Sequence, residues 1–133
     1  MINIKYLLLK DTHQKHIHKN ECTSGFILSG ENSISGALRE VEEEIGIKLN
    51  KEDGKNIHRI HRYNNGIYKH NCNMIVDIFL FIKNIDLEQT KLQKEEVIGI
   101  KWVYKEEFIK MYQNKEVVDQ FDYALELMDK GIL

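Results

Sequence analysis

The segment Gly25–Ile47, GFILSGENSISGALREVEEEIGI, is the stretch that decides the fold of this chain. Gly30 and Ser33 predict a turn and a helix N-cap, and Gly46 predicts a C-cap. Between them, apolar side chains recur at three- and four-residue steps, which is typical of a helix with one buried face: Ile34, Ala37, Leu38, Val41 and Ile45. The sequence therefore predicts one amphipathic helix in the second half of this segment.

The same helix carries a cluster of carboxylates. Glu43 and Glu44 follow Glu40 by three and four residues, so all three side chains can reach one patch beside the buried face. Like charges at these spacings destabilise an isolated helix by about 0.2–0.5 kcal/mol per pair, and Arg39 offsets only part of this repulsion. Hard carboxylate oxygens suit Mg²⁺ or Mn²⁺. The alternative is an ordinary solvated charge run, which is the interpretation we give to Glu42.

The joint spacing decides between these two interpretations. A single template fits at every fixed position: Gly25, Glu31, Arg39, Glu40, Val41, Glu43, Glu44, Gly46 and Ile47. Nine such matches arise by chance at fewer than about one in 10⁸ starting positions. In these residues the chain resembles the Nudix hydrolase family, which includes MutT-like proteins. The resemblance implies an α/β (α+β) sandwich, with a mixed β-sheet flanked by helices, in a single domain over residues 1–133.

The resemblance also implies roles for the carboxylates. In Nudix enzymes the helix glutamates hold one or more divalent cations against the substrate's diphosphate, and the residue before the box glycine adds a backbone carbonyl. Carried over to this chain, the catalytic metal ligands are Glu40, Glu43, Glu44 and the carbonyl of Ser24. A Mg²⁺ or Mn²⁺ ion would then stabilise charge on the leaving phosphate and activate a water molecule. The expected reaction is hydrolysis of a diphosphate linkage without a covalent intermediate.

Other residues of the motif resemble the family's supporting elements. Glu31 and Arg39 are similar to a pair in which the acid lies near the metal helix and the arginine holds the glutamates in place. Gly25 and Gly30 are predicted to let the loop pass close to the helix without a Cβ clash, and Gly46 to end the helix. Ordinary turn glycines are the alternative interpretation of this loop.

The general base is predicted outside the motif, with a glutamate of the motif as a further alternative. Residues 92–97, LQKEEV, resemble a loop of a bacterial Nudix subgroup in which an acid approaches the attacking water. Glu96 is the first candidate and Glu95 the second, because either could act within hydrogen-bond reach of that water. Solvated loop charges are the alternative for both residues.

The flanking sequence predicts further strands and helices. Strands are expected at residues 2–9, 22–28, 57–63, 74–82 and 98–104, and helices at 105–112 and 116–130. The turn-like run Asn64-Asn65-Gly66 suggests that strands 57–63 and 74–82 pair in antiparallel orientation. A sheet edge left without a neighbour at the N-terminus could be covered by a partner chain or by a rearranged terminus, so a homodimer is one expectation.

Composition limits the partners and the compartment. The 133 residues are 42% hydrophobic and carry a net charge of −2, which argues against general nucleic-acid binding and a membrane-surface role. The longest apolar run, residues 74–82, is shorter than the roughly 20 residues that cross a bilayer. Cys22 and Cys72 stand outside any CxxC spacing, so a reducing cytoplasm is expected.

Three functions follow from these observations. The first is hydrolysis of a nucleoside diphosphate linked to another moiety. The second is isomerisation of an isoprenoid diphosphate, because the subgroup is similar in places to isopentenyl diphosphate isomerases, and Cys22 precedes the motif. The third is a non-catalytic domain that binds a nucleotide derivative. The sequence leaves the substrate-binding residues unassigned. Plain surface is expected for His58, Arg59, His61 and Arg62, with a strand face toward the substrate cleft as the alternative. A polar loop is expected for His13, His16 and His18, with a transition-metal site as the alternative.

Overall fold

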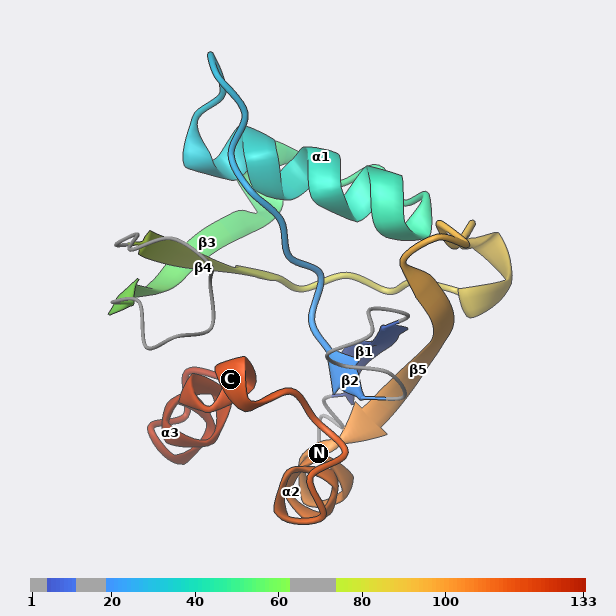
Figure 1. Cartoon of the computed structure of the whole chain (residues 1–133), viewed down its shortest axis with the longest axis vertical. Coiled ribbons are helices and arrows are strands. Elements are labelled where there is room, and N and C mark those ends of the chain that lie inside the picture. The colour runs from blue at the N-terminus through green and yellow to red at the C-terminus, as the bar shows by residue number, and fades with distance from the viewer. Residues whose placement is uncertain (1–4, 12–18, 63–73) are drawn as a thin grey trace.

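The computed structural model describes residues 5–11, 19–62 and 74–133, which form three α-helices and five strands (Figure 1). The strands are β1 (Lys5–Asp11), β2 (Asn20–Glu21), β3 (Gly54–Arg62), β4 (Met74–Phe81) and β5 (Val97–Tyr104). The helices are α1 (Ser33–Ile45), α2 (Lys105–Gln113) and α3 (Tyr123–Asp129). Short 3₁₀ turns lie at Lys51–Asp53, Leu87–Gln89 and Asp119–Phe121.

The described strands form two antiparallel sheets. One has the order β2-β1-β5, with Leu8 opposite Lys101, and the other pairs β3 with β4, with Ile60 opposite Val76. The predicted α+β class and the antiparallel pairing of β3 with β4 are both confirmed. Parallel pairing is present as an isolated bridge between Asn20 and Val117.

Helices lie on both sides of the β3–β4 sheet. Figure 1 shows β3 and β4 between α1 and α3, while α2 lies near the end of β5. On one side, the Ser33 hydroxyl at the start of α1 donates to the Asp77 carboxylate of β4 at 2.8 Å. On the other side, His58 of β3 lies against Tyr123 of α3, with ring centroids 6.3 Å apart. α1 and its carboxylates therefore lie on one side of the β3–β4 sheet, and α3 packs against the other side.

Two apolar clusters hold these layers together. Adjacent residues of a strand point to opposite faces, so Leu8 and Leu9 of β1 enter different clusters. The first cluster joins β1 and β5 to α2 and α3: Leu8, Val103, Phe108, Met111, Val117, Ala124 and Met128. The second joins β1 and β5 to the end of α1: Leu9, Ile45 and Val97. Burial of each such large side chain contributes about 1.5–3 kcal/mol, so the second cluster anchors the helix end beside Glu44.

The predicted helix over residues 116–130 is wrong in its first half. Residues 116–118 are extended instead, and α3 begins at Tyr123. The backbone N–H of Asn20 donates to the Glu116 carbonyl at 2.8 Å, and the N–H of Val118 donates to the Asn20 carbonyl at 3.0 Å. Pairing with a distant strand therefore replaces the helical hydrogen bonds that the local apolar pattern favoured.

Two smaller predictions before α1 also fail. Residues 22–28, predicted as a strand, are not one, because β2 already ends at Glu21. The N-cap of α1 is Asn32 rather than Ser33, because the Asn32 side chain accepts a hydrogen bond from the Ser35 N–H at 2.9 Å. Ser33 uses its hydroxyl for Asp77 instead.

Some predictions lie outside the described residues. These are the start of the first strand, the histidines of the following loop, the turn after β3 and the second cysteine: residues 2–4, His13, His16, His18, Asn64–Gly66 and Cys72. Among the helices that the structure does describe, none is both long enough and apolar enough to span a bilayer.

Candidate functional site

The C-terminal end of α1 is fixed by backbone contacts. Gly46 adopts a φ of 71°, as predicted for a C-cap, and its N–H donates to the Glu42 carbonyl at 2.9 Å. The N–H groups of Lys91 and Gln93 donate to the carbonyls of Ile45 and Glu44 at 2.8 and 2.9 Å. The last carbonyls of a helix have no hydrogen-bond donor within the helix. Here the backbone N–H groups of the loop before β5 are the donors. This contact brings the candidate base loop against the acidic end of α1.

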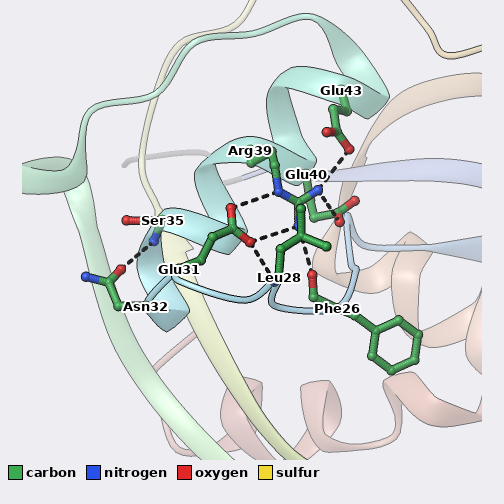
Figure 2. Close-up of polar contacts among 8 residues, drawn as sticks. All are labelled: Phe26, Leu28, Glu31, Asn32, Ser35, Arg39, Glu40 and Glu43. Carbon is green, nitrogen blue, oxygen red and sulfur yellow. Dashed lines mark hydrogen bonds and ion pairs between the residues drawn. The ribbon is translucent and has the colours of Figure 1, made fainter.

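Arg39 is the centre of a polar network on the exposed side of α1 (Figure 2). Its Nε and Nη2 donate to the two carboxylate oxygens of Glu31 at 2.9 and 3.2 Å. Its Nη1 donates to Glu40 at 2.8 Å and to Glu43 at 3.0 Å, and its Nη2 also donates to the Phe26 carbonyl at 2.8 Å. The Glu31 carboxylate raises the pKa of Arg39, and Arg39 in turn holds the pKa of Glu31 below its usual value. The expected pairing of Glu31 with Arg39 is thus observed, while its role in activity stays a prediction.

The loop before α1 runs directly along the helix at Gly25. A Cβ built on Gly25 would lie 2.5 Å from Cγ of Glu40 and nearer still to its carboxyl group. Gly25 is therefore needed for close approach, as the sequence suggested. Gly30 differs, because it adopts a φ of 86° with open space around its Cβ position, so its backbone conformation rather than a contact favours glycine.

Glu44 is the buried carboxylate of the site, with only 5% of its surface exposed. Burial, followed by the charges of Glu40, Glu21 and Glu96, raises its pKa to about 8, although a hydrogen bond from the Ser24 backbone opposes the shift. Burying a carboxylate beside like charges is unfavourable unless a cation joins them. Glu44 is therefore the strongest single indication of a cation site.

Of the three charged neighbours of Glu44, two were predicted site residues, Glu40 and Glu96, and one was not. Glu96 acts on Glu44 and is half-buried, whereas Glu95 is exposed. The choice of Glu96 as the base stays a prediction. Glu21 of β2 also acts on Glu44 but had not been singled out. The sequence could have indicated Glu21, because this residue lies three positions before Ser24 in the same extended segment.

The three box glutamates do not converge on one point. The side chain of Glu43 is 48% exposed and bound to Arg39, while that of Glu44 is buried. No group of three or more His, Cys, Asp or Glu side chains within the described ranges is arranged to hold a metal ion. The donor chemistry nevertheless fits a hard divalent cation, because carboxylates border a buried carboxylate of raised pKa. Coordination by Glu40, Glu43, Glu44 and the Ser24 carbonyl stays a prediction.

Cys22 is not poised for acid–base chemistry. Its Sγ lies 3.5 Å from the Tyr123 hydroxyl, and burial raises the pKa of the thiol to about 11. A thiolate is the reactive form of cysteine, and this environment disfavours it. The contact therefore counts against the isomerase alternative.

The basic residues of β3 lie on both sides of its sheet. Arg59 pairs with Asp77, with Nε 2.6 Å from Oδ1, toward α1. Toward α3, Arg62 pairs with Asp122 at 3.1 Å. A cavity of about 250 Å³ lies on this second side, between β3 and α3, and is lined by His58, Ile60, Arg62, Asp122, Tyr123 and Glu126. His58 and Arg62 therefore line this cavity, whereas Arg59 and His61 are exposed.

Comparison with known proteins agrees with the fold and the motif. The model of the NUDIX domain family matches residues 2–122. The chain therefore belongs to the NUDIX domain family. It is 36% identical over 89 residues to Nudix hydrolase 3 of Arabidopsis thaliana, and this match covers 65% of the chain but only 12% of that relative.

Solved structures show the same fold at low sequence identity. An Ap4A hydrolase of C. elegans, solved as a binary complex, aligns with a TM-score of 0.64 and 19% identity over 98% of this chain and 87% of that one. The NUDIX domain of Shewanella oneidensis NrtR, complexed with ADP ribose, has a TM-score of 0.64 and 14% identity over 81% and 67%. A MutT/nudix family protein from Enterococcus faecalis has a TM-score of 0.63 and 17% identity over 75% and 36%.

Proposed function

We propose that this chain is a metal-dependent hydrolase that cleaves a diphosphate linkage in a nucleoside diphosphate joined to another moiety. The observation that carries the proposal is the burial of Glu44 beside Glu21, Glu40 and Glu96. A helix that served only to stabilise the fold would not gather like charges around a buried carboxylate. A cation bound among these carboxylates would offset their repulsion, which accounts for this otherwise unfavourable arrangement.

The residues of the site divide into binding, positioning and proton transfer. Glu40 and Glu44 would hold Mg²⁺ or Mn²⁺, with Glu43 and the Ser24 carbonyl as further ligands. When bound, such a cation neutralises part of the diphosphate charge and lowers the pKa of a water molecule. Glu96 would accept a proton from the attacking water, since it already lies in the electrostatic surroundings of Glu44.

Arg39 and Glu31 would act by positioning. Arg39 bridges Glu40 and Glu43 with one nitrogen, and Glu31 fixes the guanidinium with two hydrogen bonds. A bidentate pair of this kind restricts the orientation of the arginine. The two glutamates are thereby held near the loop at Gly25 before any substrate arrives.

The proposed substrate class rests on the named relatives. One structural neighbour is called an Ap4A hydrolase and another is complexed with ADP ribose, and Ap4A and ADP ribose are both nucleotide derivatives. We further propose that residues 1–133 form one domain, that the protein acts in the cytoplasm, and that it forms a homodimer. The sheet edge expected at the first strand is not left without a neighbour, because β1 lies between β2 and β5. The matched relative is much longer, so its activity as a whole is not assigned to this chain.

The experiment is a screen of diphosphate compounds with and without Mg²⁺ or Mn²⁺, in which product release is measured for wild type, Glu44→Gln and Glu42→Gln. Glu42 is exposed on the same helix and serves as the matched control. We expect metal-dependent release that Glu44→Gln abolishes and Glu42→Gln retains. Release without added metal, or equal rates in both variants, would refute the mechanism. Tight binding of a nucleotide derivative without turnover would instead select the non-catalytic alternative.

A further inference from the structure

Asn20 and Glu44 are the two buried polar side chains among the described residues, with 8% and 5% of their surfaces exposed. The short segment of residues 20–24 connects them, since it begins at Asn20 and ends against Glu44 of α1. Asn20 begins this segment in β2, and Ser24 ends it with the backbone group that hydrogen-bonds the Glu44 carboxylate. These contacts at its two ends suggest that the anchoring of Asn20 determines where the Ser24 backbone lies relative to Glu44.

The buried amide ties β2 to the C-terminal part of the chain. Nδ2 and the backbone N–H of Asn20 both donate to the Glu116 carbonyl, at 3.1 and 2.8 Å. The Val118 N–H donates back to the Asn20 carbonyl at 3.0 Å. On the opposite edge, β2 pairs with β1 through Lys10 and Leu9. Asn20 is therefore held from both sides, 96 residues away in sequence from its side-chain partner.

A second contact continues the anchoring toward the site. Cys22 lies two residues after Asn20, and its thiol meets the Tyr123 hydroxyl at the start of α3. Tyr123 is itself packed edge-to-face on Phe121, with ring centroids 5.3 Å apart. The segment thus has one contact at residue 20 and one at residue 22 before Ser24, whose backbone meets Glu44.

We propose that Asn20 is a positioning residue of the carboxylate site, because by tying β2 to residues 116–118 it fixes the Ser24 backbone against Glu44. This inference rests on the proposed function only where it concerns the cation, since the contact between Ser24 and Glu44 exists without one. The residue acts through Ser24 and touches no reacting atom. The C-terminal segment thereby becomes part of the active-site framework.

The test compares Asn20→Ala with Met128→Ala. Asn20→Ala removes the amide and leaves the backbone hydrogen bonds of β2 in place. Met128 is buried in the cluster of α2 and α3, and its truncation destabilises the fold without altering β2. Amide hydrogen exchange is measured by NMR in the metal-free proteins at Ser24 and, as an internal reference, at Ile100 in β5. Mn²⁺ affinity is then measured by titration. Tyr123→Phe, which keeps the ring but loses the hydroxyl, tests the second anchor.

We expect exchange at Ser24 to rise about tenfold in Asn20→Ala while the rate at Ile100 changes little, as befits the loss of one buried hydrogen bond. Mn²⁺ affinity should fall about five- to tenfold in the same variant, and less in Tyr123→Phe. In Met128→Ala, exchange at the two amides should rise together and Mn²⁺ affinity should stay within twofold of wild type.

An unchanged Ser24 amide in Asn20→Ala, or a rise matched at Ile100, would overturn the inference. Equal loss of Mn²⁺ affinity in Met128→Ala would overturn it as well, because the effect would then follow global stability. If wild type bound no Mn²⁺ while Ser24 exchange still rose selectively, the proposed function would fail and the positioning of Glu44 by Asn20 would stand.

Discussion

Substitution of Gly25 by alanine separates the geometry of the site from the stability of the fold. The added Cβ would lie 2.5 Å from Cγ of Glu40, whereas carbon atoms in ordinary contact are about 3.5–4.0 Å apart, so the side chain must move by about 1 Å or more. Gly25 is not among the glycines with positive φ, so alanine is compatible with the backbone. The movable partner is the end of a flexible side chain, and an off-rotamer position costs only about 0.5–1.5 kcal/mol.

The expected result is a large loss of activity with a small loss of stability. A displacement of about 1 Å at a catalytic group can lower the rate on the order of 100-fold. The stability cost corresponds to a fall in Tm of only a few degrees for a domain of this size, roughly 2–6 °C. Steady-state turnover of a diphosphate substrate and thermal unfolding are measured on the same preparation.

Gly30→Asn is the matched control in the same loop. Asparagine tolerates positive φ, and nothing lies within 4 Å of the Cβ position at Gly30, so this variant should keep wild-type turnover. If Gly25→Ala turned over substrate at the wild-type rate, or if Gly30→Asn lost as much activity, close approach of the loop to Glu40 could not be the requirement.

Three further predictions concern metal, base and pH. Mn²⁺ at 100 times its Kd should stabilise wild type by about 2.7 kcal/mol in thermal unfolding and Glu44→Gln by much less; equal stabilisation would remove Glu44 from the ligand set. Glu96→Gln should lower kcat by about 10²–10⁴-fold without changing Mn²⁺ affinity, whereas Glu95→Gln should not; reversed results would exchange their roles. The Arg59 guanidinium, followed by the Ser33 hydroxyl, lowers the pKa of Asp77 to about 2. Because the folded-state pKa lies below the unfolded value, this stabilisation is present above about pH 4 and is lost as pH falls through about 2. Asp77→Asn should therefore cost about 1 kcal/mol at pH 7 in urea unfolding, a figure reduced because Arg59 is exposed, and the difference should shrink toward pH 2.

Much of the site could be predicted because its geometry is local in sequence. Helical periodicity alone places Arg39 one turn before Glu43, and the two atoms that meet across this spacing are 3.0 Å apart. The C-cap at Gly46 likewise depends on one residue and its required positive φ. The motif spacing added Gly25 and Glu31, whose contacts with the helix are made by residues within one loop of it.

The rest could not be predicted because it depends on contacts between distant segments. Val117 and Phe121 are four residues apart, so their apolar pattern favoured a helix, but pairing with Asn20 draws residues 116–118 into an extended conformation. Only that pairing reveals why an asparagine is buried in β2. The approach of Glu21 to Glu44 has the same origin, because β2 is positioned by β1 and by the C-terminal segment together.

The two ends of the carboxylate cluster are held by different kinds of contact. Glu44 is fixed by the backbone around it, through Ser24, Gln93 and the burial of the adjacent Ile45, and these contacts belong to the core of the fold. Glu40 and Glu43 are held by one guanidinium, which can exchange partners by rotation about side-chain bonds. A cation that binds at Glu44 can therefore recruit the other two carboxylates at the cost of rotamer changes, without moving α1. It follows that loss of Arg39 should change the rate at which Glu40 and Glu43 reach the bound cation, whereas loss of Glu44 should remove the ligand at which the cation first binds.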